Sequence, residues 1–266
     1  MASGRPRRPV LFKRDEESPS PFVLRVQRDL AELARDPPPG IYAAPEEIDV
    51  ARIYALVVGP PDTPYEGGFL FFHLTCTPEY PFEPPKVRFL TTDAGRVALH
   101  PFLYRNGNVS LSIIGTYAGP EWSSSQTLSS LLLSLQSLLS PTPYFDHPFK
   151  VHANRQQEKN AAEDYAAYVR HEVVRVSVCD IVESCLSKTS TYPAELRAKV
   201  LDLFIQNYDH YELTVKKDIH LSGTAIVNPF SSGLGSYQHE VLLTRLQSMK
   251  AEIEKRREAT VPDALE

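Results

Sequence analysis

The sequence has no apolar run long enough to cross a membrane, which takes about 18 or more consecutive apolar residues. Its longest apolar stretch, TLSSLLLSLQSLL, is interrupted by serines at helical spacing. The N-terminal residues also lack the apolar middle region of a secretory signal peptide. We therefore expect neither a membrane span nor a secretory signal.

Cysteine is scarce as well. The chain has three cysteines, Cys76, Cys179 and Cys185, and no two of them form a CxxC pair. So few cysteines cannot build the disulfide framework that stabilises small secreted domains. The pattern favours a reducing compartment, so we expect a cytoplasmic or nuclear location, or both.

Signatures of nucleotide, nucleic-acid and metal binding are missing or weak. The phosphate-cradling sequences GxxxxGK and GxGxxG do not occur, and the formal net charge of −5 offers no global attraction for nucleic acid. Basic residues cluster in the first fourteen positions, but a disordered tail over residues 1–20 is favoured over a nuclear address or a nucleic-acid arm. His147 and His152 are separated by a proline and have no cysteine partner, which favours surface or core histidines over zinc ligands.

What the sequence does contain is one helix followed by a group of strands. Residues 22–35 place Val23, Val26, Leu30 and Leu33 on one face, as an amphipathic helix does. Strand-like segments with turn chemistry between them follow at GIYAA, ARIYALVV, GFLFFHLTC and KVRFL. Their short connections predict an antiparallel meander.

The rest of the chain is predicted to be helical. Ser123 and Gln126 have the spacing of a capping box at the start of a leucine-rich helix over residues 124–140. Further helical segments are expected over residues 153–187, 193–216 and 239–257. The order of elements indicates the α+β class. We divide the chain into the tail (1–20), a core domain (21–150) and a helical C-terminal extension packed on the core (151–266).

Residues 59–91, GPPDTPYEGGFLFFHLTCTPEYPFEPPKVRFLT, carry the most specific pattern. The prolines fix backbone angles, and the glycines permit turns. The phenylalanines at 69 and 71 alternate with Leu70 and Phe72, which predicts a strand buried on both faces or covered by an added helix.

This segment closely resembles the ubiquitin-conjugating enzyme (UBC) family, whose signature reads GPxxTPYEGGxFxFxL and then YPxxPPKVxFxT. The resemblance covers residues 22 to about 148 and implies the UBC fold. The matching positions are Gly59, Pro60, Thr63, Pro64, Tyr65, Glu66, Gly67, Gly68, Phe69, Phe71, Tyr80, Pro81, Pro84, Pro85, Lys86, Val87, Phe89 and Thr91. The segments RHEVVRVSVCDIVES and IHLSGTAIVNPF further resemble the large Z-type members, which carry a helical C-terminal extension.

The segment HPFLYRNGNVSLSIIGTYAGPEW, residues 100–122, corresponds to the active-site region of that family. Counted from His100 and Pro101, the position of the family's catalytic cysteine falls on Ser110, and the asparagine of its HPN tripeptide falls on Phe102. The family's S-P-A loop corresponds to three serines at positions 123–125. The apolar residues 109, 111 and 113 alternate with serines, a strand-like pattern that predicts an accessible Ser110. The stretch as a whole is predicted to be a largely irregular active-site loop.

These departures leave two main alternatives. One is a non-catalytic UBC-fold adaptor or regulator. The other is an active conjugating enzyme with serine in place of its cysteine, as used to trap the ubiquitin-loaded form. That second alternative explains Ser110 but not Phe102 or Ser124. Asn106 or Asn108 could replace the lost asparagine, although Asn106 reads as a turn residue. A serine hydrolase is disfavoured because Ser110 lies in no GxSxG elbow.

The resemblance also implies partners: ubiquitin or a ubiquitin-like modifier, an activating enzyme and a ubiquitin ligase, with no metal or cofactor, no nucleic acid and no membrane. The contact positions it implies, besides the first helix, are Phe82, Pro84, Tyr117, Trp122 and Ser124. A phenylalanine in a proline-rich loop suits a partner anchor, but Phe82 could equally cap the core.

Overall fold

A computed structural model describes residues 20–150 and 154–260. The helices and strands follow the order α1 (Pro21–Arg35), β1 (Ile41–Glu46), β2 (Asp49–Val58), β3 (Phe69–Thr75), β4 (Lys86–Phe89), α2 (Leu128–Ser137), α3 (Lys159–Glu172), α4 (Ile181–Leu186), α5 (Ala194–Gln206), α6 (Tyr208–Lys217) and α7 (His239–Thr260). A π-helix, η3 (Val173–Asp180), joins α3 to α4, and short 3₁₀ turns occur at η1 (Ser112–Ile114), η2 (Pro143–Asp146) and η4 (Ile219–Leu221). The predicted tail up to residue 19 and His152 lie outside the described residues.

The strands form one antiparallel sheet in the order β1-β2-β3-β4, which confirms the predicted meander. Helix α1 begins after Ser20, whose hydroxyl accepts a hydrogen bond from the Val23 amide. Together with the helices after β4, the sheet confirms the predicted α+β class and the UBC fold with a helical C-terminal extension. Within the described residues, no helix is long and apolar enough to cross a membrane.

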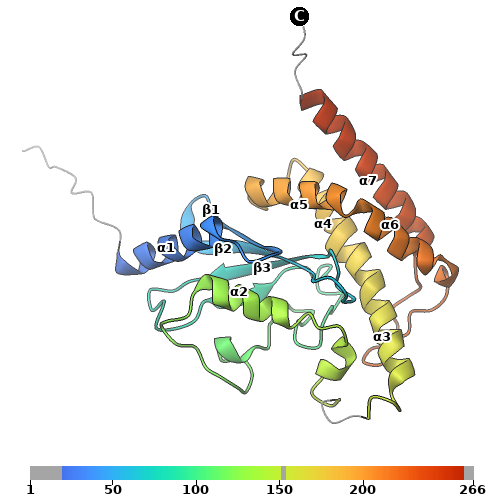
Figure 1. Cartoon of the computed structure of the whole chain (residues 1–266), viewed down its shortest axis with the longest axis horizontal. Helices are drawn as coiled ribbons and strands as arrows, with labels where there is room; N and C mark the ends of the chain where they lie inside the picture. The colour runs from blue at the N-terminus through green and yellow to red at the C-terminus, as the bar shows by residue number, and fades with distance from the viewer. Residues whose placement is uncertain (1–19, 151–153, 261–266) are drawn as a thin grey trace, which may run out of the picture.

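Strand β3 is buried on both faces, as its sequence predicts. Leu70, Phe72 and Leu74 point into a core that α1 and α2 share with the sheet. Phe69 and Phe71 point to the other face, where they pack in a second core with side chains of η3, α5, α6 and α7. Figure 1 shows α2 along the sheet, and α4, α6 and α7 on the far side of the molecule from α1, while α5 reaches back toward β1. The extension therefore covers a sheet face that would otherwise be apolar and exposed.

The extension packs closely against the core backbone at Gly67 and Gly68, the glycine pair of the signature. Gly67 has φ +73°, and a Cβ there would lie 2.7 Å from the Tyr211 ring. The Tyr211 hydroxyl donates a 2.8 Å hydrogen bond to the Gly67 carbonyl. A Cβ on Gly68 would meet the Val173 side chain, also at 2.7 Å. The glycines are thus needed for two reasons: Gly67 adopts a left-handed turn conformation, and both positions leave room for side chains of η3 and α6 to pack on the core.

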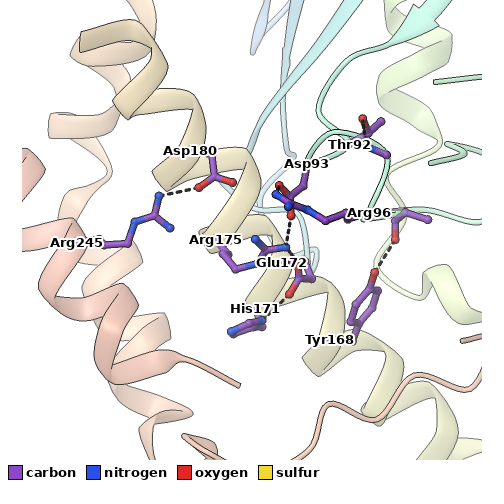
Figure 2. Close-up of polar contacts among 11 residues, drawn as sticks. Thr92, Asp93, Arg96, Tyr168, His171, Glu172, Arg175, Asp180 and Arg245 are labelled. Atoms are coloured by element: carbon purple, nitrogen blue, oxygen red, sulfur yellow. Dashed lines mark hydrogen bonds and ion pairs between the residues drawn. The ribbon is translucent and has the colours of Figure 1, made fainter. Parts of the chain in front are cut away.

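Ion pairs of η3 join the core to the extension and join η3 to α7 (Figure 2). Arg175 on η3 donates to Asp93 of the core at 2.8 Å and to Glu172 at 2.6 Å. Arg245 on α7 pairs with Asp180 at the end of η3, also at 2.6 Å. Burial alone would raise the pKa of Glu172, but hydrogen bonds from His171 and Arg175 hold it below its usual value.

Two local predictions are wrong. The helix expected over residues 124–140 begins at Leu128, because Thr127 and Ser130 form the capping box. The serine at 123 does not cap a helix: its hydroxyl pairs with Ser125, while its amide donates to the Gln126 side chain. Around residue 110 the backbone is irregular, as predicted, and it leads into the turn η1. The helix expected over residues 153–187 is present from Lys159 to Leu186, with a π-helical middle.

Candidate functional site

The residues around Ser110 form a loop that is closed by hydrogen bonds within its own backbone. The Leu103 amide donates to the His100 carbonyl at 3.0 Å, and the Ser110 amide donates to the Phe102 carbonyl at 2.9 Å. Between these bonds the chain turns at Asn106, whose side-chain oxygen accepts from the Asn108 amide at 3.0 Å. The side-chain oxygen of Asn106 is therefore engaged in the turn, as expected of a turn residue.

Ser110 is half-buried at the mouth of this loop. Its hydroxyl donates a 3.2 Å hydrogen bond to the hydroxyl of Tyr104, a side chain that is 43% exposed. A phenol in its ordinary neutral state is a poor proton acceptor, so Tyr104 does not activate the serine. The predicted accessibility of Ser110 is thus partial.

His100 holds the start of the loop and is buried. Its Nδ1 accepts a 3.0 Å hydrogen bond from the Phe102 amide, which leaves the ring proton on Nε2, 3.3 Å from an Asp146 oxygen. Burial lowers the pKa of the imidazole, so the ring is neutral at pH 7. Both nitrogens are occupied in fixing the loop, and His100 is not placed to act as a base for Ser110.

Phe102 fills the position of the family asparagine with an aromatic ring. Its ring centroid lies 4.9 Å from that of Tyr117 and 5.6 Å from that of His100. Pro101, between His100 and Phe102, is half-buried in the same turn. The structure therefore brings the four predicted site positions together. At position 102, however, it has an aromatic ring that packs on its neighbours instead of an amide that could donate a hydrogen bond.

Sequence reasoning missed three polar partners of the loop. Tyr104 and Asp146 contact Ser110 and His100, as described above. Thr116 closes the segment after Ser110: its hydroxyl accepts from the Leu111 amide at 2.9 Å and donates to the Val109 carbonyl at 2.7 Å. Tyr104 and Thr116 lie within the conspicuous segment and could have been considered, but nothing in the sequence connects Asp146 to His100.

The predicted contact positions lie on neighbouring loops. Phe82 is 82% exposed, so it does not cap the core. Trp122 donates from its indole nitrogen to the Pro81 carbonyl at 2.8 Å, which ties the two loops together next to the half-buried Pro84. Ser124 is exposed, and its carbonyl accepts from Arg25 of α1 at 3.2 Å. Tyr117 is 44% exposed and covers Phe102.

The histidine considered as a zinc ligand has another role. His147 stacks on Phe230 of the extension with ring centroids 4.2 Å apart. Among the described residues, no three histidine, cysteine, aspartate or glutamate side chains are grouped as a metal site would require.

Comparisons with known proteins show which family the chain belongs to. The family model described as ubiquitin-conjugating enzyme matches residues 25–173, more than half of the chain. Ubiquitin-conjugating enzyme E2 Z of Xenopus tropicalis is 40% identical over 93% of this chain and 77% of its own. The Homo sapiens protein of that name is also 40% identical, over 88% of this chain and 64% of its own length. The solved structure of human ubiquitin-conjugating enzyme E2 G1 is 36% identical, covering 45% of this chain and 94% of its own, with a TM-score of 0.39.

The matched region includes the signature loop and the loop around Ser110, and the matched relatives extend through the C-terminal helices. The chain therefore belongs to the ubiquitin-conjugating enzyme family.

Proposed function

We propose that this chain works in ubiquitin conjugation as a catalytically impaired or inactive member, which binds partners of the pathway without efficient thioester transfer. The observation that carries the proposal is the environment of Ser110. Its hydroxyl has a phenol as its partner, and the nearby His100 ring is neutral, buried and fully hydrogen-bonded.

Chemistry at oxygen differs from chemistry at sulfur in both halves of the transfer. A thiol ionises near pH ~8.5 and is a good leaving group, whereas a serine hydroxyl needs an adjacent base to attack an acyl group. An acyl group on Ser110 would form an oxyester, which reacts slowly with an amine. Loading is thus disfavoured at the first step, and discharge to lysine at the second.

The loss of the asparagine compounds this effect. In the family, that amide is assigned to loop support and to the oxyanion of the transfer step. Removing one oxyanion donor typically costs about 100- to 1,000-fold in turnover. Phe102 supports the loop by packing on Tyr117 and His100, but its side chain has no hydrogen-bond donor.

The cysteines of the chain offer no substitute nucleophile. Cys76, Cys179 and Cys185 are all buried, and burial raises the pKa of each to about 12. A protonated thiol inside the core neither reaches an activated modifier nor attacks it.

Binding surfaces remain for the partners that the family implies: ubiquitin or a related modifier, an activating enzyme and a ligase. The exposed Phe82 supports a role as an aromatic anchor. Ser124 and its neighbours present an exposed loop held in place by Arg25. An adaptor of this kind would act where conjugating enzymes act, in the cytoplasm or nucleus.

The proposal is tested with activating enzyme, ubiquitin and ATP. We expect the wild-type chain to give at most a slowly formed adduct at Ser110 that resists dithiothreitol, is cleaved by alkali and does not pass ubiquitin to free lysine. Ser110→Cys should form a dithiothreitol-sensitive adduct, and the matched control Ser112→Cys should not.

Two outcomes would contradict this expectation. Transfer from the wild-type adduct to lysine at a rate close to that of Ser110→Cys would mean that Ser110 is a competent nucleophile. Full transfer activity in Ser110→Cys, with Phe102 unchanged, would favour the alternative that the chain is an active enzyme bearing a trapping substitution.

A further inference from the structure

A cavity of about 460 Å³ lies between the Ser110 loop and the extension. Pro101 and Tyr104 line it from the loop, Tyr165 and Tyr168 from α3, and Phe230 from the segment after η4. Tyr104 is 43% exposed and is a direct hydrogen-bond partner of Ser110. The cavity therefore adjoins the family's active-site position, and the C-terminal extension supplies part of its wall.

The aromatic wall is held rigidly. The Phe230 ring stacks on His147 with centroids 4.2 Å apart and on Tyr144 at 5.2 Å, and it meets Tyr165 edge to face at 5.1 Å. The Tyr168 hydroxyl donates to the Ala98 carbonyl at 3.1 Å. Rings fixed in this way lose little freedom when a ligand binds, so they suit an apolar or aromatic side chain.

One permanent charge faces this cavity. Arg105 lines it, is exposed, and has no ion-pair partner among the described residues, but its guanidinium donates a 2.6 Å hydrogen bond to Ser231. Burial lowers the pKa values of the other titratable bases in the lining, His100 and His147, which keeps their rings neutral. Asp146 contacts His100 but does not line the cavity.

The other arginines nearby are already neutralised, which makes Arg105 distinctive. Arg175 pairs with Asp93 and Glu172, and Arg96 also pairs with Asp93 (Figure 2). Because Arg105 is a single cation without an ion-pair partner among the described residues, the site favours one carboxylate over a polyanion such as nucleic acid. Guanidinium groups bind carboxylates through short, charge-assisted hydrogen bonds.

We propose that this cavity is a non-covalent binding site for a peptide segment in which an aromatic side chain lies next to a carboxylate. The aromatic side chain packs in the cavity against the wall formed by Tyr165, Tyr168 and Phe230, and the carboxylate pairs with Arg105. Ser231 positions the guanidinium for that contact. The inference goes beyond the proposed function, because such binding does not depend on whether Ser110 accepts an acyl group.

The test measures fluorescence anisotropy of two rhodamine-labelled probes, Gly-Phe-Glu-Gly and Gly-Phe-Gln-Gly with a blocked C-terminus, titrated with the full chain. We expect the glutamate probe to bind about tenfold more tightly than the glutamine probe. Arg105→Gln should remove that difference, and Ser231→Ala should reduce it. Arg35→Gln, which changes an exposed arginine on α1, is the matched control and should leave both affinities unchanged.

Several results would overturn the proposal: no saturable binding of the glutamate probe, equal binding of both probes, or an equal loss for both probes in Arg105→Gln. A similar loss in Arg35→Gln would also overturn it, because it would indicate general charge attraction. Phe230→Leu should weaken both probes together, since it trims the aromatic wall and leaves Arg105 in place. The comparison of the two probes on the wild-type chain needs no variant, so it stands even if a variant unfolds.

Discussion

At the scale of single residues, the loop around Ser110 keeps its shape while its chemistry differs from the family pattern. The backbone bond from Ser110 to Phe102 and the imidazole contact of His100 hold the turn without an asparagine. Under the proposed function, Phe102 therefore supports the loop by packing and offers no side-chain hydrogen-bond donor.

This division predicts the behaviour of a double variant. In Ser110→Cys, adding Phe102→Asn should accelerate discharge of the thioester to free lysine by about 100-fold, because it restores a donor for the oxyanion. Single-turnover discharge followed on non-reducing gels measures the rate. Equal rates in the single and double variants would show that no donor is missing at position 102. Asn108→Ala, made in the double variant, is the control for rescue by a neighbouring amide.

A second prediction at this scale concerns His239, the first residue of α7. It is 4% exposed, and neither ring nitrogen has a hydrogen-bond partner among the described residues. Burial, with a smaller contribution from His171, lowers its pKa from 6.5 to about 4. Because the unfolded chain binds this proton more readily, stability falls as pH drops from about 6.5 toward 4.

His239→Phe should remove that loss. We expect the free energy of unfolding to rise by about 2 kcal/mol more at pH 5 than at pH 7, which follows from the lowered pKa. Urea denaturation at the two pH values measures it. His220→Asn, which removes only a minor contribution to the lowered pKa of His239, should change the pH dependence much less than His239→Phe does. An increase of the same size at both pH values would rule out the titration of His239 as its source.

At the scale of elements, the sequence predicted the helices and strands that have a periodic apolar pattern. It missed details that depend on local hydrogen bonds. The helix over 22–35 and the meander follow from periodicity and turn chemistry, and both are confirmed. The alternation at Val109, Leu111 and Ile113 correctly marks buried positions, but not a strand, because the amides of Ser110 and Leu111 bond within the loop. The π-helix η3 has the same apolar spacing as an α-helix and could not be distinguished from one.

Two sequence patterns near the start of α2 have the spacing of a capping box, Ser123 with Gln126 and Thr127 with Ser130, and only the second caps the helix. Thr127→Ala should lower the free energy of unfolding by about 1 kcal/mol, because it removes a side-chain cap from the Ser130 amide. Ser123→Ala, the position that the sequence favoured, should change it by a few tenths at most, since its hydroxyl contacts an exposed Ser125. Thermal or urea unfolding compares them. A larger effect at Ser123 would place the functional cap four residues earlier.

At the scale of the whole molecule, the sheet is the shared centre of two cores. The signature segment predicted that β3 is covered on both faces, and the helical pattern predicted an extension. Which residues meet could not be predicted, because Asp93 and Arg175 are far apart in sequence and their pairing depends on the docking of η3. The ligand cavity beside Arg105 was missed for the same reason, since the segment around Phe230 completes it.

Shared burial predicts cooperative unfolding. Trp122 is the single tryptophan and lies in the core domain, so its fluorescence reports on that part alone. Circular dichroism at 222 nm reports mainly on the helices, many of which belong to the extension. We expect the two signals to change with coincident midpoints in urea. Separate midpoints would show that the extension unfolds independently of the sheet.

The ion pairs at the junction give a further whole-molecule prediction. Arg175→Met should lower the free energy of unfolding by about 3 kcal/mol, because it leaves the buried Glu172 without its arginine partner and removes one of the two arginines from Asp93. Adding Glu172→Gln should recover part of that loss. Since the pKa of Glu172 is lowered in the folded chain, its contribution is present above its ordinary pKa and disappears as pH falls through the lowered value. Urea unfolding at pH 7 and in acid tests both statements.

The burial of every cysteine also determines how the chain meets oxidants and electrophiles. Cys76, Cys179 and Cys185 are inside the two cores with raised pKa values, and the half-buried position 110 carries an alcohol. Peroxide and alkylating reagents act on accessible thiolates, so the folded chain should resist both, unlike relatives that carry a cysteine at this position. A cysteine introduced at position 110 would then be the one site at which the native protein takes a thiol-directed label.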